Sequence, residues 1–502
     1  MDKEPDILRT EVQRAIIRLK NKKAPGVDGI TAEVLKAMGE TGVDLIHMIC
    51  KQIWNTGKWP DEWCNSIFVP IFKKGSPLEC SNYRTIALIP HASKILLTII
   101  NERLKSFLLP QISDEQTGFI PGKGTREQIL NLRQIIEKSR EYNIGMYLCF
   151  IDYSKAFDRV KWNKLWTILL EMGTPPHLIH LVKRLYENNN AKIRANNTLS
   201  SNFKSNAGVR QGCILSPILF NTYTEHIMRR VMEGWTGGIS VGGRRINNLR
   251  YADDTVIIAA SKEEMQEIMT RLCSISEEYG LELNKQKTKT MIVDRPHNNQ
   301  PDVQTVAGYE VVSVVNYLGS MITNSGGCEA EIRRRVAMAR NATTKLTKIW
   351  KATAITRNNK LRIANSLIFP IVMYGSETWT LMESDKQQIN ALEMWVYRRL
   401  LRVPWTARRT NISIIEELNI ETRLVTKINQ SILRYFGHIA RRGDSMERLM
   451  VEGKVEGRRT RGRAPKRWID QIKTLVGHNL PEASHMAQSR GTWSEEVRKI
   501  NT

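Results

Sequence analysis

The amino-acid sequence predicts an α+β protein, with a sheet covered by helices on one side and a mostly helical C-terminal region. Three observations indicate this class. Short apolar runs of strand length alternate with segments of helical periodicity over the first 320 residues. Two of these runs lie against carboxylates, at residue 152 and at residues 253 and 254. Beyond about residue 320 the apolar spacing becomes almost entirely helical.

The N-terminal elements are predicted from periodicity and from chain breakers. A helix is expected over residues 7–20, where apolar side chains recur at helical spacing, and the chain then breaks at Pro25-Gly26. Residues 60–90 indicate short strands around the loop Lys73-Lys74-Gly75. A helix is expected to follow over residues 93–107.

A tight hairpin is predicted around residue 253. Residues 255–260 (TVIIAA) are typical of a buried strand, and residues 247–251 can supply the strand before it. Asp253 and Asp254 then lie at the hairpin tip. After the hairpin, Ser261 and Glu264 form a capping-box pattern, which predicts the start of a helix.

A second apolar run, from Met146 to Ile151, predicts a strand that ends at Asp152. If this strand lies beside the hairpin, three carboxylates meet at one end of a sheet, and they repel one another unless cations are bound. Hard oxygen ligands with room for phosphates suit two Mg²⁺ ions, which activate a hydroxyl and stabilise a leaving phosphate. Either motif alone favours the simpler interpretation, which is a polar hairpin tip or an unrelated acidic strand end.

The composition favours a polyanionic partner. The chain has 75 Lys+Arg against 51 Asp+Glu, a formal net charge of +24, which points to nucleic acid, although a basic solvated surface is the alternative. Seven cysteines form no CxxC pair, which favours a reducing compartment. No apolar run reaches the length of a membrane span, and the first residues are not a signal peptide. An intracellular protein of the cytoplasm and nucleus, without a membrane partner, is expected.

The segments around the carboxylates occur in the order of reverse-transcriptase palm motifs, and further motifs flank them. The chain resembles the polymerases of non-LTR (LINE-type) retrotransposons over about residues 20–320, with a looser C-terminal similarity to the RTE-like branch. The residues that carry this resemblance are Ala24–Gly29, Asn82–Leu88, Phe150–Asp158, Arg210–Pro217, Tyr251–Asp254, Gly280–Asn284, Lys287-Thr288 and Tyr317–Ser320.

The resemblance implies a right-hand polymerase with fingers, palm and thumb, and a two-metal reaction. Asp152 and Asp253 are expected to bind two Mg²⁺ ions, for which Mn²⁺ can substitute, with Asp254 as a third carboxylate. A primer 3′-hydroxyl attacks the α-phosphate of a dNTP and pyrophosphate leaves. Template RNA, primer DNA and dNTPs are the expected partners.

Further site residues are expected from the same resemblance. Phe157 packs beneath the sugar and excludes a 2′-hydroxyl, or else is a core residue that starts a helix. Asp158 caps or pairs with the following helix rather than binding metal. The remaining residues are Lys73, Lys74 and Arg84 for the triphosphate, Gln211 and Gly212 for nucleotide and template, Lys287 as proton donor to pyrophosphate, and Tyr317, Leu318 and Gly319 as primer grip.

Three regions are expected: fingers and palm over residues 1–320, a helical thumb-like region over 321–424, and a basic nucleic-acid-binding segment over 425–502. Arg333, Arg334 and Arg340 lie along a duplex or simply face solvent. The basic run of the last segment binds nucleic-acid phosphates, acts as a nuclear-import signal or is a solvated tail. In the first case Trp468 is expected to stack on a base. The residues of the run are Arg458, Arg459, Arg461, Arg463, Lys466 and Arg467.

Two other functions stay open. A group II intron-type maturase shares the YADD tetrad and a basic C-terminal region but acts by folding RNA. A non-catalytic nucleic-acid-binding remnant is the other, and the intact carboxylates argue against it. We expect no endonuclease before the polymerase, and no ribonuclease H domain after residue 320, where no spaced-carboxylate set is evident. The RNA that is copied, the source of the primer and the oligomeric state are open.

Overall fold

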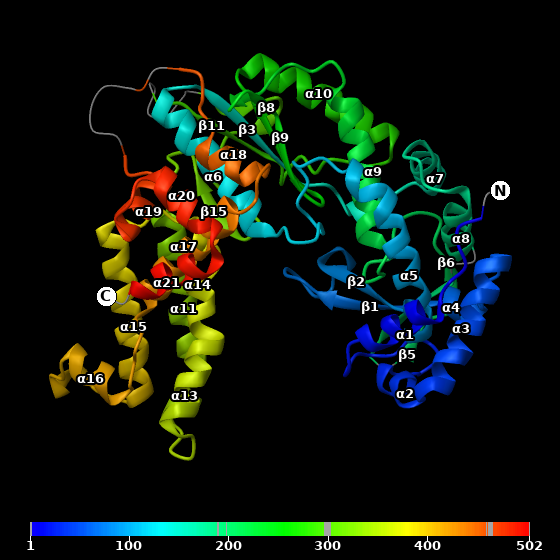
Figure 1. Ribbon diagram of the computed structural model, residues 1–502, viewed down its shortest axis with the longest axis horizontal. Coiled ribbons are helices and arrows are strands. Elements are labelled where there is room, and N and C mark those ends of the chain that lie inside the picture. The colour runs from blue at the N-terminus through cyan, green and yellow to red at the C-terminus, as the bar shows by residue number, and fades with distance from the viewer. Residues whose placement is uncertain are drawn as a thin grey trace. The chain divides into compact units, whose positions relative to one another are not determined.

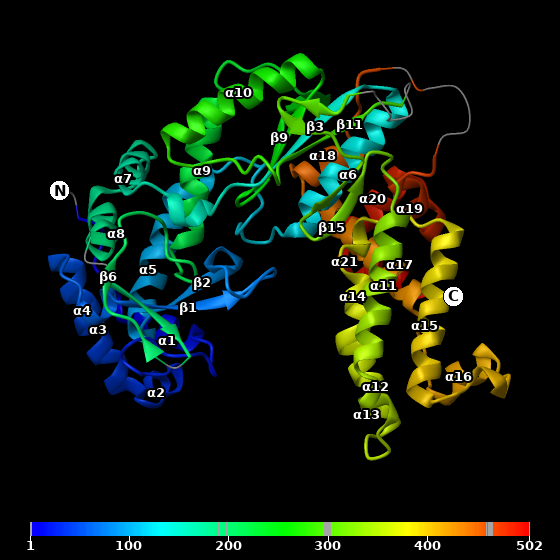
Figure 2. The same cartoon turned by 180° about the vertical axis from the view of Figure 1, so that it is seen from behind.

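The computed structural model, shown in Figures 1 and 2, describes residues 3–187, 190–196, 198–295, 303–457, 459 and 465–500. The chain forms two compact units, each assembled from segments that are far apart in the sequence. Unit 1 contains residues 1–122, 152–235 and 268–284, and unit 2 contains residues 123–151, 236–267 and 285–502. Both units combine helices with sheets, so the predicted α+β class is confirmed.

The sheet of unit 1 is built on an antiparallel hairpin. β1 (Ser66–Phe72) pairs with β2 (Tyr83–Leu88), with Ile71 opposite Arg84. Most residues of β1 are β-branched or aromatic, which favours an extended strand. On its other edge β1 runs parallel to β4 (Asn190–Ala195). The short strands β5 (Thr198–Leu199) and β6 (Phe203–Lys204) pair with β4.

In unit 1, helix α5 packs against α1 and α9, and its apolar residues are buried on nearly every side. Each fully buried aliphatic side chain contributes about 1.5–3 kcal/mol, so α5 anchors this unit. The two predicted N-terminal helices are confirmed, and α5 begins at His91, directly after Pro90. The helices are α1 (Arg9–Arg18), α2 (Ala32–Ala37), α3 (Gly39–Thr56), α4 (Asp61–Cys64), α5 (His91–Leu108), α7 (Trp162–Glu171), α8 (Pro176–Glu187) and α9 (Ser216–Met232).

Unit 2 contains a four-stranded antiparallel sheet in the order β11-β3-β10-β9. The predicted strands are found within one residue of their expected bounds. One face of the sheet packs on α6 (Thr125–Tyr142) in a single apolar core (Figure 2). The strands are β3 (Met146–Ile151), β9 (Asn248–Tyr251), β10 (Asp254–Ala259) and β11 (Lys289–Val293).

The helix after the hairpin, α10 (Lys262–Glu278), begins as predicted. The Ser261 hydroxyl accepts a hydrogen bond from the Glu264 N–H (3.1 Å). The Glu264 carboxylate accepts from the Ala260 N–H (2.9 Å), one residue before the position that a capping box requires. Both bonds satisfy backbone donors at the start of the helix.

Three short hairpins complete the strands of unit 2. They are β7 (Ile239–Val241) with β8 (Arg244–Ile246), β12 (Thr305–Val306) with β13 (Tyr309–Glu310), and β14 (Val314–Tyr317) with β15 (Ser320–Thr323). After β15 every element in the described part of the chain is helical, as the spacing predicts.

The C-terminal helices of unit 2 share one apolar core, which extends from α11 to α21. Met446, Met450 and Val455 instead join the core of the four-stranded sheet, so α18 packs beside α6. The helices are α11 (Glu329–Lys345), α12 (Thr347–Lys351), α13 (Arg357–Ile363), α14 (Phe369–Met373), α15 (Glu383–Leu401), α16 (Asn411–Glu417), α17 (Leu424–Ala440), α18 (Met446–Glu452), α19 (Trp468–Val476), α20 (Leu480–Gln488) and α21 (Arg490–Lys499). Among the described residues, none of the helices is both long and apolar enough for a bilayer span.

Candidate active site

The β9–β10 hairpin places two carboxylates at its tip. Tyr251 is opposite Asp254, which leaves Ala252 and Asp253 as a two-residue loop. Ala252 has a φ of 57°, the positive value that the first position of a primed hairpin turn requires. Asp253 therefore stands at the tip and the exposed Asp254 opens β10, as the sequence predicts.

The register of the sheet relates this hairpin to Asp152. Ile151, the last residue of β3, is opposite Thr255 of β10. Asp152 is the next residue after Ile151, and Asp254 is the residue before Thr255. The covalent chain thus places both carboxylates at the same end of the sheet.

The segment after Asp152 is fixed by the motif around residue 283. The Asp152 carbonyl accepts a hydrogen bond from the Asn284 N–H (2.7 Å), and the Ser154 N–H donates to the Glu282 carbonyl (2.8 Å). Tyr153 and Leu283 form an antiparallel bridge between these two bonds. These backbone bonds hold the strand end that carries Asp152.

The donors at this sheet end are carboxylate oxygens, the ligand type that Mg²⁺ and Mn²⁺ prefer. The ligand type therefore fits the expected ions at Asp152, Asp253 and Asp254. As the side chains stand, the described residues include no group of three or more His, Cys, Asp or Glu arranged to hold a metal ion. A three-carboxylate metal centre stays a prediction.

In unit 1, charged and polar groups expected at the nucleotide gather around Asp158. Gln211 Nε2 donates to Asp158 Oδ1 (3.2 Å). Desolvation raises the pKa of the Asp158 carboxyl, and the Gln211 bond and the charges of Lys155, Lys73 and Arg84 oppose that rise. Asp158 therefore pairs with the Gln211 motif rather than with the following helix. Sequence reasoning missed this role, because nothing local to Asp158 indicates the contact.

The basic residues expected to bind the nucleotide are solvent-accessible. Lys73 and Lys74 follow β1 and are exposed, as is Arg84 on β2. The Lys73 N–H donates to the Asn82 carbonyl (2.9 Å), which closes the loop between the two strands. Lys287, on the loop before β11 of unit 2, is exposed as well.

Phe157 is half-buried and lies between two other rings. It stacks on Phe220, with ring centroids 4.1 Å apart and an interplanar angle of 13°. The ring centroid of Phe119 lies 6.3 Å from that of Phe157, with an interplanar angle of 83°. One face of Phe157 is thus held by the core while the ring stays partly accessible, a position compatible with both the sugar gate and the core role.

The backbone of Gly212 lies close to the backbone of β2. The Ala87 N–H donates to the Gln211 carbonyl (2.7 Å). Gly212 has a φ of 103°, and a Cβ there would lie 3.1 Å from the Ala87 carbonyl oxygen. Both facts require glycine.

We therefore expect Gly212→Ala to lower the free energy of unfolding by about 2 kcal/mol, because a strained φ adds to a tight contact. Gly234→Ala is the matched control in the same unit, with a φ of 67° and nothing within 4 Å of the added Cβ. It should cost about 1 kcal/mol. Urea unfolding measures both, and equal losses would show that the Ala87 contact is harmless.

The β14–β15 hairpin forms the turn expected to grip the primer. Tyr317 is opposite Ser320, and the two loop residues, Leu318 and Gly319, have φ values of 49° and 77°. Two positive values define a type I′ loop. Tyr317 itself is buried, and its ring centroid lies 5.8 Å from that of Phe150 of β3.

A buried carboxylate, Glu331 of α11, holds this turn. Glu331 accepts hydrogen bonds from the Met321 N–H (3.0 Å), Arg334 Nε (2.8 Å) and Arg335 Nε (2.7 Å). Both arginines also donate to the Gly319 carbonyl. The two guanidinium groups therefore link the turn to α11.

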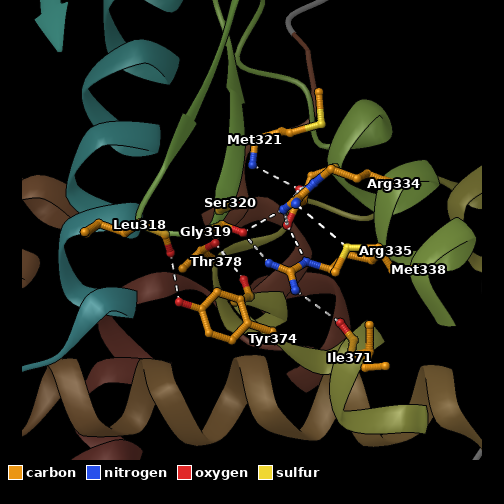
Figure 3. A network of polar contacts seen from close by, with 12 residues as sticks. Leu318, Gly319, Ser320, Met321, Arg334, Arg335, Met338, Ile371, Tyr374 and Thr378 are labelled. Atoms are coloured by element: carbon orange, nitrogen blue, oxygen red, sulfur yellow. Dashed lines mark hydrogen bonds and ion pairs between the residues drawn. The ribbon is translucent and has the colours of Figure 1, made fainter. Parts of the chain in front are cut away.

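Tyr374 supports the same turn from the other side (Figure 3). Its hydroxyl donates to the Leu318 carbonyl (2.8 Å), and the Arg335 guanidinium lies 4.5 Å from its ring centroid. Sequence reasoning missed Glu331, Arg335 and Tyr374. The four-residue spacing of Glu331 and Arg335 is the one signal that could have indicated a pair.

The basic residues expected along a duplex differ in their surroundings. Arg334 is engaged with Glu331 and the turn. Arg333 and Arg340 are exposed, and the Arg340 guanidinium lies 6.0 Å from the Trp395 ring centroid. A nucleic-acid contact of these residues stays a prediction.

In the basic C-terminal run, Arg458, Arg461 and Arg463 lie outside the described residues. Arg459 pairs with Glu141, and Arg467 pairs with Glu141 (3.0 Å) and Asp470 (2.8 Å). Lys466 Nζ donates to the Leu381 carbonyl (3.1 Å). These contacts hold Arg459 and Arg467 against α6, and Lys466 against the segment before α15.

The expectation that Trp468 stacks on a base is wrong. Its side chain is fully buried in the helical core, with its ring centroid 6.4 Å from that of Phe436. Its Nε1 donates to the Glu377 carbonyl (3.0 Å). A buried indole with a satisfied donor is a packing residue.

Comparisons with known proteins agree with this arrangement. The family described as "Reverse transcriptase (RNA-dependent DNA polymerase)" matches residues 71–322, half of the chain. The segment contains the two carboxylate strand ends, Gln211-Gly212 and the β14–β15 turn.

Several curated relatives come from mobile elements of insects. The chain is 26% identical to a probable RNA-directed DNA polymerase from transposon X-element of Drosophila melanogaster, covering 86% of this chain and 48% of the relative. It is 24% identical to the RNA-directed DNA polymerase from mobile element jockey of the same species (94% and 51%). A Pol polyprotein from retrotransposable element R2 of Nasonia vitripennis is 27% identical (54% and 26%). The chain spans about half the length of the first two relatives.

Among solved structures, a telomerase from Candida albicans with a fragment of telomeric RNA is similar at 13% identity, with a TM-score of 0.43, covering 72% of this chain and 68% of that one. The family match and the mobile-element relatives confirm the resemblance to non-LTR retrotransposon polymerases. The fold is that of a right-hand polymerase, and the chain belongs to the reverse transcriptase family.

Proposed function

We propose that this chain is an RNA-directed DNA polymerase of a non-LTR retrotransposon, which extends a primer 3′-hydroxyl with dNTPs and releases pyrophosphate. One observation carries the proposal: Ile151 is opposite Thr255, so the acids that adjoin them belong to the same sheet end. The family match supports the assignment of that sheet end to nucleotidyl transfer.

In this function Asp152, Asp253 and Asp254 hold two Mg²⁺ ions, for which Mn²⁺ can substitute. The ions, when bound, favour deprotonation of the primer hydroxyl and stabilise the charge on the leaving pyrophosphate. The carboxylates supply the negative charge that retains the cations and orient them towards the substrate.

The polar groups of unit 1 bind the dNTP. The guanidinium of Arg84 suits bidentate contact with phosphate, and the ammonium groups of Lys73 and Lys74 act as point charges. Gln211 is oriented by its bond to Asp158, while Gly212 keeps its loop against β2. Lys287 is the proposed proton donor to pyrophosphate.

We propose that the chain has three functional regions. Residues 1–320 form fingers and palm, residues 321–424 form a thumb-like region, and residues 425–502 contribute nucleic-acid contacts. The turn at Leu318-Gly319, braced by Glu331, positions the primer end. Template RNA and primer DNA are the proposed macromolecular partners.

Primer extension tests the proposal. The purified chain is given Mg²⁺, dNTPs and a DNA primer annealed to an RNA template, to a DNA template, or left single-stranded. We expect template-matched extension on both templates and none without one. Tight RNA binding without extension would favour a maturase or a binding remnant instead.

We expect Phe157→Val to raise incorporation of ribonucleotides relative to deoxyribonucleotides by about 10–100-fold, since a smaller side chain leaves room for a 2′-hydroxyl. Phe203→Val, an exposed aromatic on β6 of the same unit, is the control and should leave the ratio unchanged. Competitive single-nucleotide addition measures the ratio. An unchanged ratio in an active Phe157→Val chain would make Phe157 a core residue only.

A further inference from the structure

A basic pocket in unit 2 lies outside the polymerase site described above. It is a cavity of about 600 Å³ between the start of α6, the turn Ser376–Thr378, α17 and α21. Helices α17, α20 and α21 pack against one another (Figure 1). The volume falls in the range of nucleotide-sized ligands.

The pocket is lined by five guanidinium groups and a single carboxyl, that of Glu377. Burial raises the pKa of the Glu377 carboxyl, and the nearby charge of Arg126 opposes that rise. The arginines come from distant parts of the sequence: Arg126, Arg434, Arg441, Arg490 and Arg498.

Most of this positive charge has no carboxylate partner. Arg126 pairs with Glu127 (3.0 Å), whereas Arg434 donates to the Gln430 side-chain oxygen (3.2 Å) and Arg441 to the Ala487 carbonyl (2.8 Å). The side chains of Arg490 and Arg498 are exposed, and neither guanidinium forms a hydrogen bond or ion pair within the described part of the chain. Like charges held this close repel one another, so the pocket gains from an anion.

The walls also present polar groups without a partner. The Tyr435 hydroxyl and His438 Nε2 are buried and have no hydrogen-bond partner among the residues that the structure describes. Tyr435 is only 2% exposed, and the Arg126 guanidinium lies 4.7 Å from its ring centroid. A buried hydroxyl left unpaired costs about 1–3 kcal/mol, so a ligand oxygen at this position would be stabilising.

We propose that this pocket binds the phosphodiester backbone of a single-stranded nucleic acid. Planar guanidinium groups match phosphate oxygens in fork geometry, and the Tyr435 hydroxyl can donate a further hydrogen bond. The choice of nucleic acid as the ligand rests on the proposed function. The binding itself requires neither metal nor dNTP.

Binding of a fluorescent single-stranded RNA of 12 nucleotides with a 5′-hydroxyl, across a salt series without metal or dNTP, tests the site. Arg490→Ala/Arg498→Ala should weaken binding and reduce the slope of log K against log salt by about 1.4, which is about 0.7 per phosphate contact. The control Arg14→Ala/Arg18→Ala removes two exposed charges from α1 of unit 1 and should change the slope far less. Equal slopes in the two variants would overturn the site.

Tyr435→Phe provides a second test with an opposite effect on stability. Removing an unpaired buried hydroxyl should raise the unfolding temperature, while RNA affinity falls severalfold because the donor to phosphate is lost. Unchanged RNA affinity would contradict the proposed contact.

Two further probes identify the ligand. An RNA with a 5′-phosphate distinguishes a strand end from an internal phosphodiester, because only an end site gains affinity from it. The second probe is a poly-glutamate peptide. If Arg490→Ala/Arg498→Ala lowers the affinity for this peptide more than the affinity for RNA, nucleic acid is not the ligand of the pocket. RNA binding at this site does not require catalysis. If the unchanged chain fails to extend a primer but still shows a steeper salt slope than Arg490→Ala/Arg498→Ala, the polymerase function is refuted and this site is not.

Discussion

Asp152→Asn and Asp253→Asn should each lower the rate of primer extension by about 10³-fold or more, with little change in the fold. The substitutions keep the size of the side chain and remove the charge that retains the metal ions. Asp152 follows the last residue of β3, and Asp253 occupies the tip of the β9–β10 loop. Single-turnover addition of one matched dNTP measures the effect.

Asp444→Asn is the control, an exposed carboxylate between α17 and α18 with no hydrogen bond in the described part of the chain. Its rate should equal that of the unchanged chain. Template affinity should survive in all three variants, because phosphate contacts rather than carboxylates dominate it. Appreciable synthesis by Asp152→Asn or Asp253→Asn would remove that residue from the metal centre.

Glu331→Gln should lower the free energy of unfolding by about 3–5 kcal/mol, the usual loss when one partner of a buried ion pair is removed. Glu331 is fully buried and the Arg335 side chain is 7% exposed, so the remaining guanidinium keeps little access to water. The turn at Leu318-Gly319 loses its brace, and primer affinity should fall with stability.

Glu329→Gln, two residues earlier in the first turn of α11, is the matched control. It should cost less than about 1 kcal/mol, because only a favourable interaction with the helix dipole is lost. Chemical denaturation compares the two variants. A Glu331→Gln loss as small as that of the control would show that the network in Figure 3 does not brace the turn.

The strand ends that carry Asp152 and Asp253 could be predicted because their signals are local. Met146–Ile151 is an apolar run of strand length, and the TVIIAA segment follows the acids directly. A two-residue loop with polar residues between such runs specifies a hairpin and its register. The carboxylates therefore fall where the sequence places them, without knowledge of the tertiary structure.

Contacts between distant segments could not be predicted. The arginine pocket joins residue 126 to residue 498, and Glu331 acts on a turn that belongs to another element. For Trp468 the sequence predicted a contact that does not exist. An aromatic residue beside a basic run is typical of base stacking, but the side chain of Trp468 is buried. Periodicity identifies a face of a helix but not its neighbour.

Correlated measurement of primer growth and pyrophosphate release tests the central claim most directly. The chain is bound to a DNA primer on an RNA template, and one matched dNTP is added with Mg²⁺. We expect one pyrophosphate for each nucleotide added, dependent on the template base, and neither product when Asp253 is replaced by Asn. Stable binding of the duplex with no nucleotide addition by the unchanged chain would contradict the polymerase assignment.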